Sequence, residues 1–191
     1  MNPLLYKLSV RYGLLIGGIS AVLSIVFYLI NPMLQYTSLL VPILSLVIVL
    51  ALLVILGIEV RKHIGGFWNF GQAFVSLMIM SAVTVIISLL VSFVIMKFVD
   101  PNLPAKINDA MVDVTSQRLE KMGVDQATID KSTAMFTNGE FIAKLKPTLV
   151  NELTSFGWAL LLYAVIDLII AACIKKNPPM FTPVSDSEFV E

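Results

Sequence analysis

The fold is decided by residues 59–74, which read Glu59-Val-Arg-Lys-His-Ile-Gly-Gly-Phe-Trp-Asn-Phe-Gly-Gln-Ala-Phe74. This segment is a short polar break between two long apolar runs, and it contains Arg61, Lys62 and the only histidine of the chain, His63. Short loops that carry Lys and Arg beside a membrane span are retained on the cytoplasmic side of the bilayer. Placing this loop in the cytoplasm therefore orients every other segment of the chain.

The composition is typical of an integral membrane protein. Of the 191 residues, 58% are hydrophobic and only 14% are charged, whereas about a quarter of the residues of a soluble domain are charged. The formal net charge is zero, so we expect no binding to nucleic acid. One cysteine, Cys173, and one histidine cannot form an internal disulfide or a structural zinc site. We expect no metal site and no cofactor.

The apolar residues concentrate in four runs, which predict transmembrane helices at residues 12–30, 39–58, 73–98 and 153–174. The first run is not followed by a small-residue cleavage site, so we interpret it as an uncleaved span. By the positive-inside rule, the basic residues beside short segments place one end of the bundle, with both chain termini, in the cytoplasm. These topology-determining residues are Lys7, Arg11, Arg61, Lys62, Lys175 and Lys176.

Residues 100–147 interrupt this pattern between the third and fourth predicted spans. Their charges alternate in sign, and apolar residues recur at helical spacing, which predicts amphipathic helices in an extracytoplasmic insert. Asp125 is placed to cap the second of these helices. The insert has too little apolar surface for an independent core. We therefore expect lipid, a second copy or another protein to shield its apolar residues, which are Ile107, Met111, Val114, Ile129 and Phe136.

The predicted fold class is an all-α integral membrane protein with four transmembrane helices. Residues 1–176 form one membrane domain that includes the insert, and the Pro-rich, acidic residues 177–191 are predicted to be a disordered cytoplasmic tail. Gly13, Gly17 and Ala21 recur at every fourth position of the first span. Small residues at this spacing let a neighbouring helix approach closely. We favour packing within the chain, and a self-dimerising face is the alternative.

Asp167 is the one ionisable residue well inside a predicted span. It precedes Ile174 by seven residues, so it lies about 10 Å from the cytoplasmic boundary at a rise of about 1.5 Å per residue. A carboxylate at such a position costs about 2.5–3.5 kcal/mol and should find a partner. At the same depth, the other helices offer an intramembrane polar cluster of hydroxyls, which are Ser20, Ser24, Ser81 and Thr84.

Two interpretations of Asp167 follow. In the first, the protonated or hydrogen-bonded carboxyl is a polar clasp that holds helices together. In the second, Asp167 carries protons. The clasp is favoured at this point because one acid without a relay makes a poor pathway.

Three sequence segments together resemble a bacterial membrane family that is catalogued as domain of unknown function 4199 and is typical of Bacteroidota. They are the Arg11-Tyr-Gly-Leu-Leu-Ile-Gly start, the loop from Arg61 to Phe74, and Lys97-Phe-Val-Asp-Pro-Asn. The resemblance extends to about Lys176 and includes no catalytic signature. It implies a multi-pass inner-membrane protein of a Gram-negative bacterium with a periplasmic insert. It also suggests a partner system, a polyprenyl-phosphate glycosyltransferase, because genes for such enzymes often neighbour genes of this family.

Three classes of function follow from these patterns. By elimination we favour a non-enzymatic accessory or scaffold subunit that binds partners through its periplasmic helices and cytoplasmic loop. The alternative is a small oligomeric transporter or proton-coupled carrier that uses Asp167. A membrane enzyme is the least favoured, because the sequence shows no acid cluster and no nucleophile with a base. In each case we expect contact with the lipid bilayer and a homo-oligomer or heteromeric membrane complex.

Overall fold

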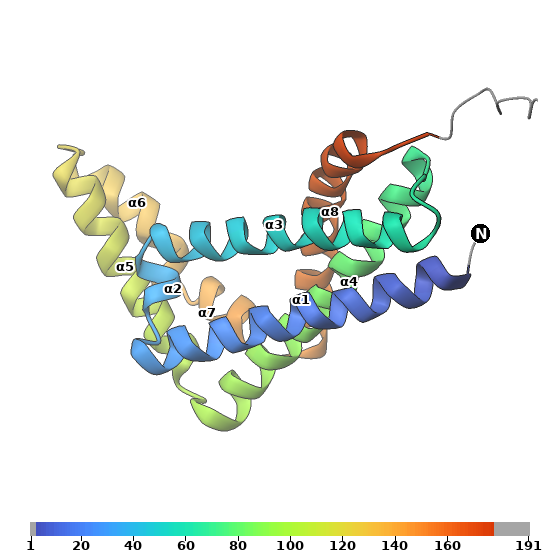
Figure 1. Cartoon of the computed structure of the whole chain (residues 1–191). Coiled ribbons are helices and arrows are strands. Elements are labelled where there is room, and N and C mark those ends of the chain that lie inside the picture. The colour runs from blue at the N-terminus through green and yellow to red at the C-terminus, as the bar shows by residue number, and fades with distance from the viewer. Residues whose placement is uncertain (1–2, 178–191) are drawn as a thin grey trace, which may run out of the picture.

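The structure is a computed structural model that describes residues 3–177. In this range four helices are long and apolar enough to cross a membrane, which confirms the predicted all-α fold with four membrane-length helices. They are α1 (Pro3–Ile30), α3 (Leu40–His63), α4 (Phe70–Val94) and α8 (Leu149–Ile174) (Figure 1). A π-helical turn, η1 (Ile95–Val99), extends α4. The predicted disordered tail lies outside the described residues, apart from Asn177.

The loop between α3 and α4 has the local chemistry that a chain reversal needs. Gly65 and Gly66 adopt φ angles of +111° and +81°, a region that side chains other than glycine rarely enter. Asn69 and Gln72 then form a capping box: each side chain accepts a hydrogen bond from the backbone N–H of the other, at 2.8 and 3.1 Å. These contacts end α3, start α4 and make the two helices antiparallel.

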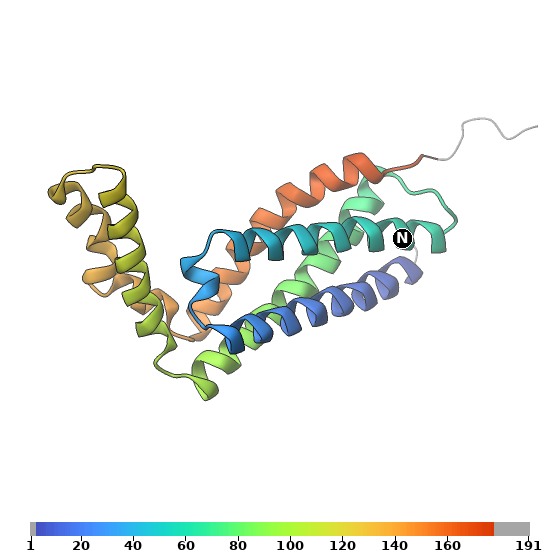
Figure 2. The same ribbon diagram turned by 60° about the vertical axis from the view of Figure 1, so that its left-hand side comes forward.

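The bundle is built around α4. Helix α1 packs along one side of α4 and α8 along another, while α3 contacts α1, α4 and α8 (Figure 2). We call the end of the bundle with residues 64–69 the loop end and the opposite end the insert end. The start of α1 and the end of α8 both lie at the loop end, together with the six basic residues from which the orientation is predicted. Large apolar side chains are exposed over α3 and α8, as a helix in lipid requires.

Four shorter or more polar helices lie at the insert end. They are α2 (Leu34–Thr37), α5 (Leu103–Lys121), α6 (Gln126–Thr137) and α7 (Glu140–Leu145). Helices α5 and α6 form a hairpin that projects away from the four long helices (Figure 2). As predicted, Asp125 caps α6, and its side chain accepts a hydrogen bond of 3.1 Å from the Thr128 N–H. Hydrogen bonds from the Thr128 side chain and backbone lower the pKa of Asp125.

The apolar residues of the insert are shielded mainly by the chain itself. Ile107, Ile129 and Phe136 are buried, and the Phe136 ring packs edge to face on Phe141 at 4.9 Å between centroids. The expectation that lipid, a second copy or another protein must cover them is therefore wrong for these three residues. The sequence did not reveal helices α2 and α7, and these supply the missing apolar surface. Met111 and Val114 are partly buried.

Candidate intramembrane polar site

The contact between α1 and α4 is made at two glycines. A Cβ atom on Gly13 would lie 2.9 Å from both the Met80 carbonyl oxygen and the Val83 Cβ, and one on Gly17 would overlap the Ile87 side chain. The Thr84 hydroxyl lies 3.3 Å from the Gly13 carbonyl oxygen and 2.9 Å from that of Met80, so it bridges the two helices. The small-residue face of α1 is thus used for packing within the chain.

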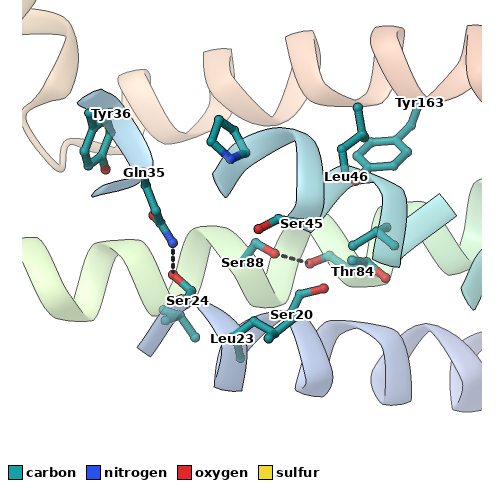
Figure 3. Close-up of a pocket in the computed structure, with 14 residues that line it drawn as sticks. Ser20, Leu23, Ser24, Gln35, Tyr36, Ser45, Leu46, Thr84, Ser88 and Tyr163 are labelled. Atoms are coloured by element: carbon teal, nitrogen blue, oxygen red, sulfur yellow. Dashed lines mark hydrogen bonds between the residues drawn. The ribbon is translucent and has the colours of Figure 1, made fainter. Parts of the chain in front are cut away.

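Beyond this contact the helices separate around a cavity of about 390 Å³, which Ala21 also lines. A second cavity of about 300 Å³ adjoins it toward the insert end, since the two share Ser24, Gln35, Tyr36 and Ser88. We call the joined cavities the vestibule. Their volumes fall in the range of small-molecule sites, about 300–1,000 Å³. The first cavity has polar side chains from five helices, which are Ser20, Ser24, Gln35, Tyr36, Ser45, Thr84, Ser88 and Tyr163 (Figure 3).

The polar side chains of the vestibule are only partly paired with one another. The Gln35 amide donates to the Ser24 hydroxyl at 3.4 Å, and the Ser88 hydroxyl donates to the Thr84 carbonyl oxygen at 3.0 Å (Figure 3). The buried Ser20 hydroxyl has no hydrogen-bond partner among the described residues. No described residue that lines either cavity is Lys, Arg, His, Asp or Glu. The vestibule therefore offers neutral donors and acceptors to a ligand or to water.

Asp167 lies one helical turn from the vestibule, on the side of the loop end. It follows Tyr163 by one turn of α8, and Ser81 precedes Thr84 by one turn of α4. The Asp167 side chain is fully buried at 0% exposure. Neither of its carboxyl oxygens, nor the Ser81 hydroxyl, has a hydrogen-bond partner among residues 3–177. The Ser81 hydroxyl is nevertheless close enough to the Asp167 carboxyl to interact with it.

The structure divides the predicted polar cluster into two neighbouring parts. Asp167 and Ser81 lie together, whereas Ser20 and Ser24 line the vestibule. Thr84 is between the two parts, and its hydroxyl is already bonded to backbone carbonyl groups. Sequence reasoning did not assign Gln35, Tyr36, Ser45 or Tyr163 to the site. Of these, only Tyr163 had a usable signal, its position one turn before Asp167 on the same helix.

The loop end is closed by an apolar cluster and by a group of hydrogen bonds that we call the latch. The Arg61 guanidinium and the Trp68 indole N–H both donate to the Ile174 carbonyl oxygen, at 2.7 and 3.1 Å. Trp68 and Lys176 also exchange two backbone hydrogen bonds of 2.9 and 3.1 Å. The latch, Arg61, Trp68, Ile174 and Lys176, joins the loop to the end of α8. Sequence reasoning had assigned Arg61 and Lys176 to topology alone.

A further polar contact at the loop end joins α1 to α4. The buried hydroxyls of Ser9 and Ser76 are 2.7 Å apart and hydrogen-bonded. Neither residue was singled out in the sequence. Together with the latch, this bond ties α1, α4, α8 and the loop at the same end.

Four membrane-length apolar helices, a hydroxyl-lined cavity between them and a buried carboxyl beside it define an all-helical membrane protein with an intramembrane polar site. The chain belongs to the family described as "Protein of unknown function (DUF4199)", whose sequence profile matches residues 11–176. The matched region includes α1 from residue 11 onward, the other three long helices, the insert and the latch. No curated protein and no solved structure matches the chain.

Proposed function

We propose that the protein is a non-enzymatic, proton-coupled membrane carrier that admits a small polar solute to the vestibule from the insert end. The observation that carries this proposal is a fully buried carboxyl without a hydrogen-bond partner among the described residues, one turn from a hydroxyl-lined cavity. Buried polar groups are normally hydrogen-bonded, and ionisable residues inside a membrane bundle typically mark a pathway. A clasp would need hydrogen bonds from Asp167 to hydroxyls of other helices, and the described residues form none.

The charges around the vestibule limit the charge of the solute that it can bind. Its described lining residues provide hydroxyls and an amide but no cationic group, and the ionisable group beside it is the acid Asp167. An anion in this cavity would be desolvated without a compensating charge, at a cost of several kcal/mol. The solute class that fits is a neutral or cationic molecule with hydrogen-bonding groups.

The path for the proton follows the order of the side chains. A proton that enters through the vestibule meets the Tyr163 hydroxyl at its inner end, and Ser81 and Asp167 one turn further on. Hydroxyl groups both donate and accept hydrogen bonds, so they can relay a proton to a carboxylate. Binding the proton removes the charge of Asp167, which is the change that can couple uptake to the state of the carrier.

We also propose that the loop end is cytoplasmic and that α5, α6 and α7 are periplasmic, in a bacterial inner membrane. The six basic residues at the loop end support this orientation. A cysteine at Ser132, which is exposed on α6, should react with a membrane-impermeant maleimide in intact spheroplasts of a Cys173→Ser strain. Reaction only after the cytoplasmic side is made accessible would show that the orientation is the opposite one.

Labelling of the vestibule with a hydrophilic thiol reagent tests the proposed function. In the Cys173→Ser background, we expect Ser88→Cys to react from the insert side at least about tenfold faster than Ile86→Cys, because only a hydrated thiol ionises readily. Both residues are exposed positions of α4, but Ile86 lines an apolar surface groove. Equal, slow labelling of the two cysteines would contradict a water-filled vestibule.

An accessory or scaffold role is the second candidate function. The α5–α6 hairpin supports it, because this hairpin projects away from the bundle (Figure 2) and exposes Met122 at its turn. A dry vestibule in the labelling experiment, together with a stable heteromeric partner in purified membranes, would favour this role. The enzyme suggested by gene neighbourhood, a polyprenyl-phosphate glycosyltransferase, is the first partner to examine.

A further inference from the structure

We propose that the latch is the gate of the carrier on the loop side. When Arg61 and Trp68 release the Ile174 carbonyl group and the two backbone hydrogen bonds between Trp68 and Lys176 separate, the last two turns of α8 move away from the loop and open a path between Asp167 and the loop end. This inference rests on the proposed function, because it assigns to the latch the second of the two openings that a carrier needs.

The two side-chain hydrogen bonds of the latch meet at a single backbone atom. The last four carbonyl groups of a helix lack partners within the helix, and the Ile174 oxygen at the end of α8 receives two side-chain donors. One donor is charged, and charge-assisted hydrogen bonds are about twice as strong as neutral ones. The donors come from α3 and from the loop, so three segments are joined at this atom. Breaking these two hydrogen bonds, together with the two backbone hydrogen bonds between Trp68 and Lys176, would free the end of α8 from both segments.

Only a thin apolar layer separates Asp167 from the latch. Ile170, Ala171 and Ile174 are buried and follow Asp167 on the same face of α8. They pack in the core cluster with Val60, Trp68 and Leu77. At about 1.5 Å of rise per residue, this layer is about 10 Å thick. Displacing two turns of one helix is therefore enough to expose the carboxyl to the loop side.

Helices α3 and α8 pack loosely against each other on the insert side of the latch. A groove of about 680 Å³ with an entirely apolar lining, which includes Val54, Ile55, Ile166 and Ile169, lies between these helices. Helix α8 packs far more extensively on α4 than on α3. The hydrogen bond from Arg61 to the end of α8 is thus a strong contact between two helices that otherwise pack loosely against each other. An arrangement of this kind lets α8 separate from α3 while it keeps its contact with α4.

The experiment measures access to the apolar layer from the loop side. The reporter is Ile170→Cys in the Cys173→Ser background, labelled with a hydrophilic cationic thiosulfonate on the loop side of oriented membrane vesicles. Arg61→Met and Trp68→Phe each remove one donor to Ile174 and keep most of the side-chain volume. We expect each to raise the labelling rate about tenfold, the fold-change for losing one such hydrogen bond. Lys62→Met is the matched control, because the exposed Lys62 bonds to Glu59 and not to α8, and it should leave the rate unchanged.

A second reporter separates gating from a general loss of packing. Ile16 is fully buried in α1, a helix that packs mainly on α4 rather than on α8, so labelling of Ile16→Cys should not change in any of these variants. Equal increases at Ile16→Cys and Ile170→Cys would show that the latch only stabilises the fold, and no increase at Ile170→Cys would also overturn the gate. Labelling of Ser88→Cys from the insert side does not depend on the latch. If Ser88→Cys reacts but Ile170→Cys does not respond to the latch variants, the gate is wrong and the vestibule stands. If Ser88→Cys does not react either, the proposed carrier is wrong.

Discussion

The Asp167→Asn protein is expected to remain folded and to lose proton uptake. Asparagine has nearly the same shape as aspartate but cannot bind and release a proton near neutral pH. Because the carboxyl makes no hydrogen bond within the described chain, the amide should change the free energy of unfolding little. In proteoliposomes with a potassium diffusion potential, an internal pH dye should report uptake for the parent protein and only background for Asp167→Asn.

Two further variants at this position sharpen the result. Asp167→Glu keeps a titratable group and should retain part of the uptake, whereas Asp167→Leu should abolish it as asparagine does. If Asp167 were instead a clasp, asparagine would keep function and leucine would lose about 0.6 kcal/mol for each interhelical hydrogen bond. An Asp167→Asn protein with the proton uptake of the parent would therefore contradict the carrier.

The Gly13→Ala protein is expected to be markedly destabilised, although only one methyl group is added. That methyl group would lie 2.9 Å from the Met80 carbonyl oxygen, a backbone atom that cannot turn aside. Overpacking of this kind costs about 1–3 kcal/mol, and it would also strain the Thr84 hydrogen bond to Gly13. Unfolding in detergent micelles by a titration with sodium dodecyl sulfate measures the loss.

Gly18→Ala is the matched control, because a Cβ atom there meets nothing within 4 Å. It should be neutral or slightly stabilising, since alanine favours helix over glycine by up to about 1 kcal/mol. Gly17→Ala should fall between the two, because its nearest neighbour is the movable end of the Ile87 side chain. Equal stability of the Gly13→Ala and Gly18→Ala proteins would show that α1 and α4 do not pack as described.

The four long helices were predictable because a span needs a long apolar run, and such a run is visible in any sequence. The packing of the apolar residues inside the insert was not predictable, because α2 and α7 are too short for a clear periodic signal. Counting depth along the helices placed Ser81 at the level of Asp167, and in the structure the two side chains are close enough to interact. It also selected Ser20 and Ser24, which line the vestibule instead, because depth does not determine how a helix is rotated about its axis.

The latch could not be predicted for a different reason. Arg61 was assigned to topology, and Trp68 is visible in the same polar segment. Their common acceptor is a backbone oxygen of residue 174, and a backbone carbonyl group has no sequence signature. Its availability as an acceptor depends only on α8 ending there.

The position of the latch acceptor also has a consequence for biogenesis. Chains fold from the N-terminus during synthesis, and Ile174 is the last residue of the last long helix. Arg61 and Trp68 therefore lack this acceptor until α5, α6, α7 and α8 have all been synthesised. Ribosomes that stall before residue 174 would leave an incomplete bundle in which the Trp68 indole, buried in the complete chain, lacks its acceptor at the loop end.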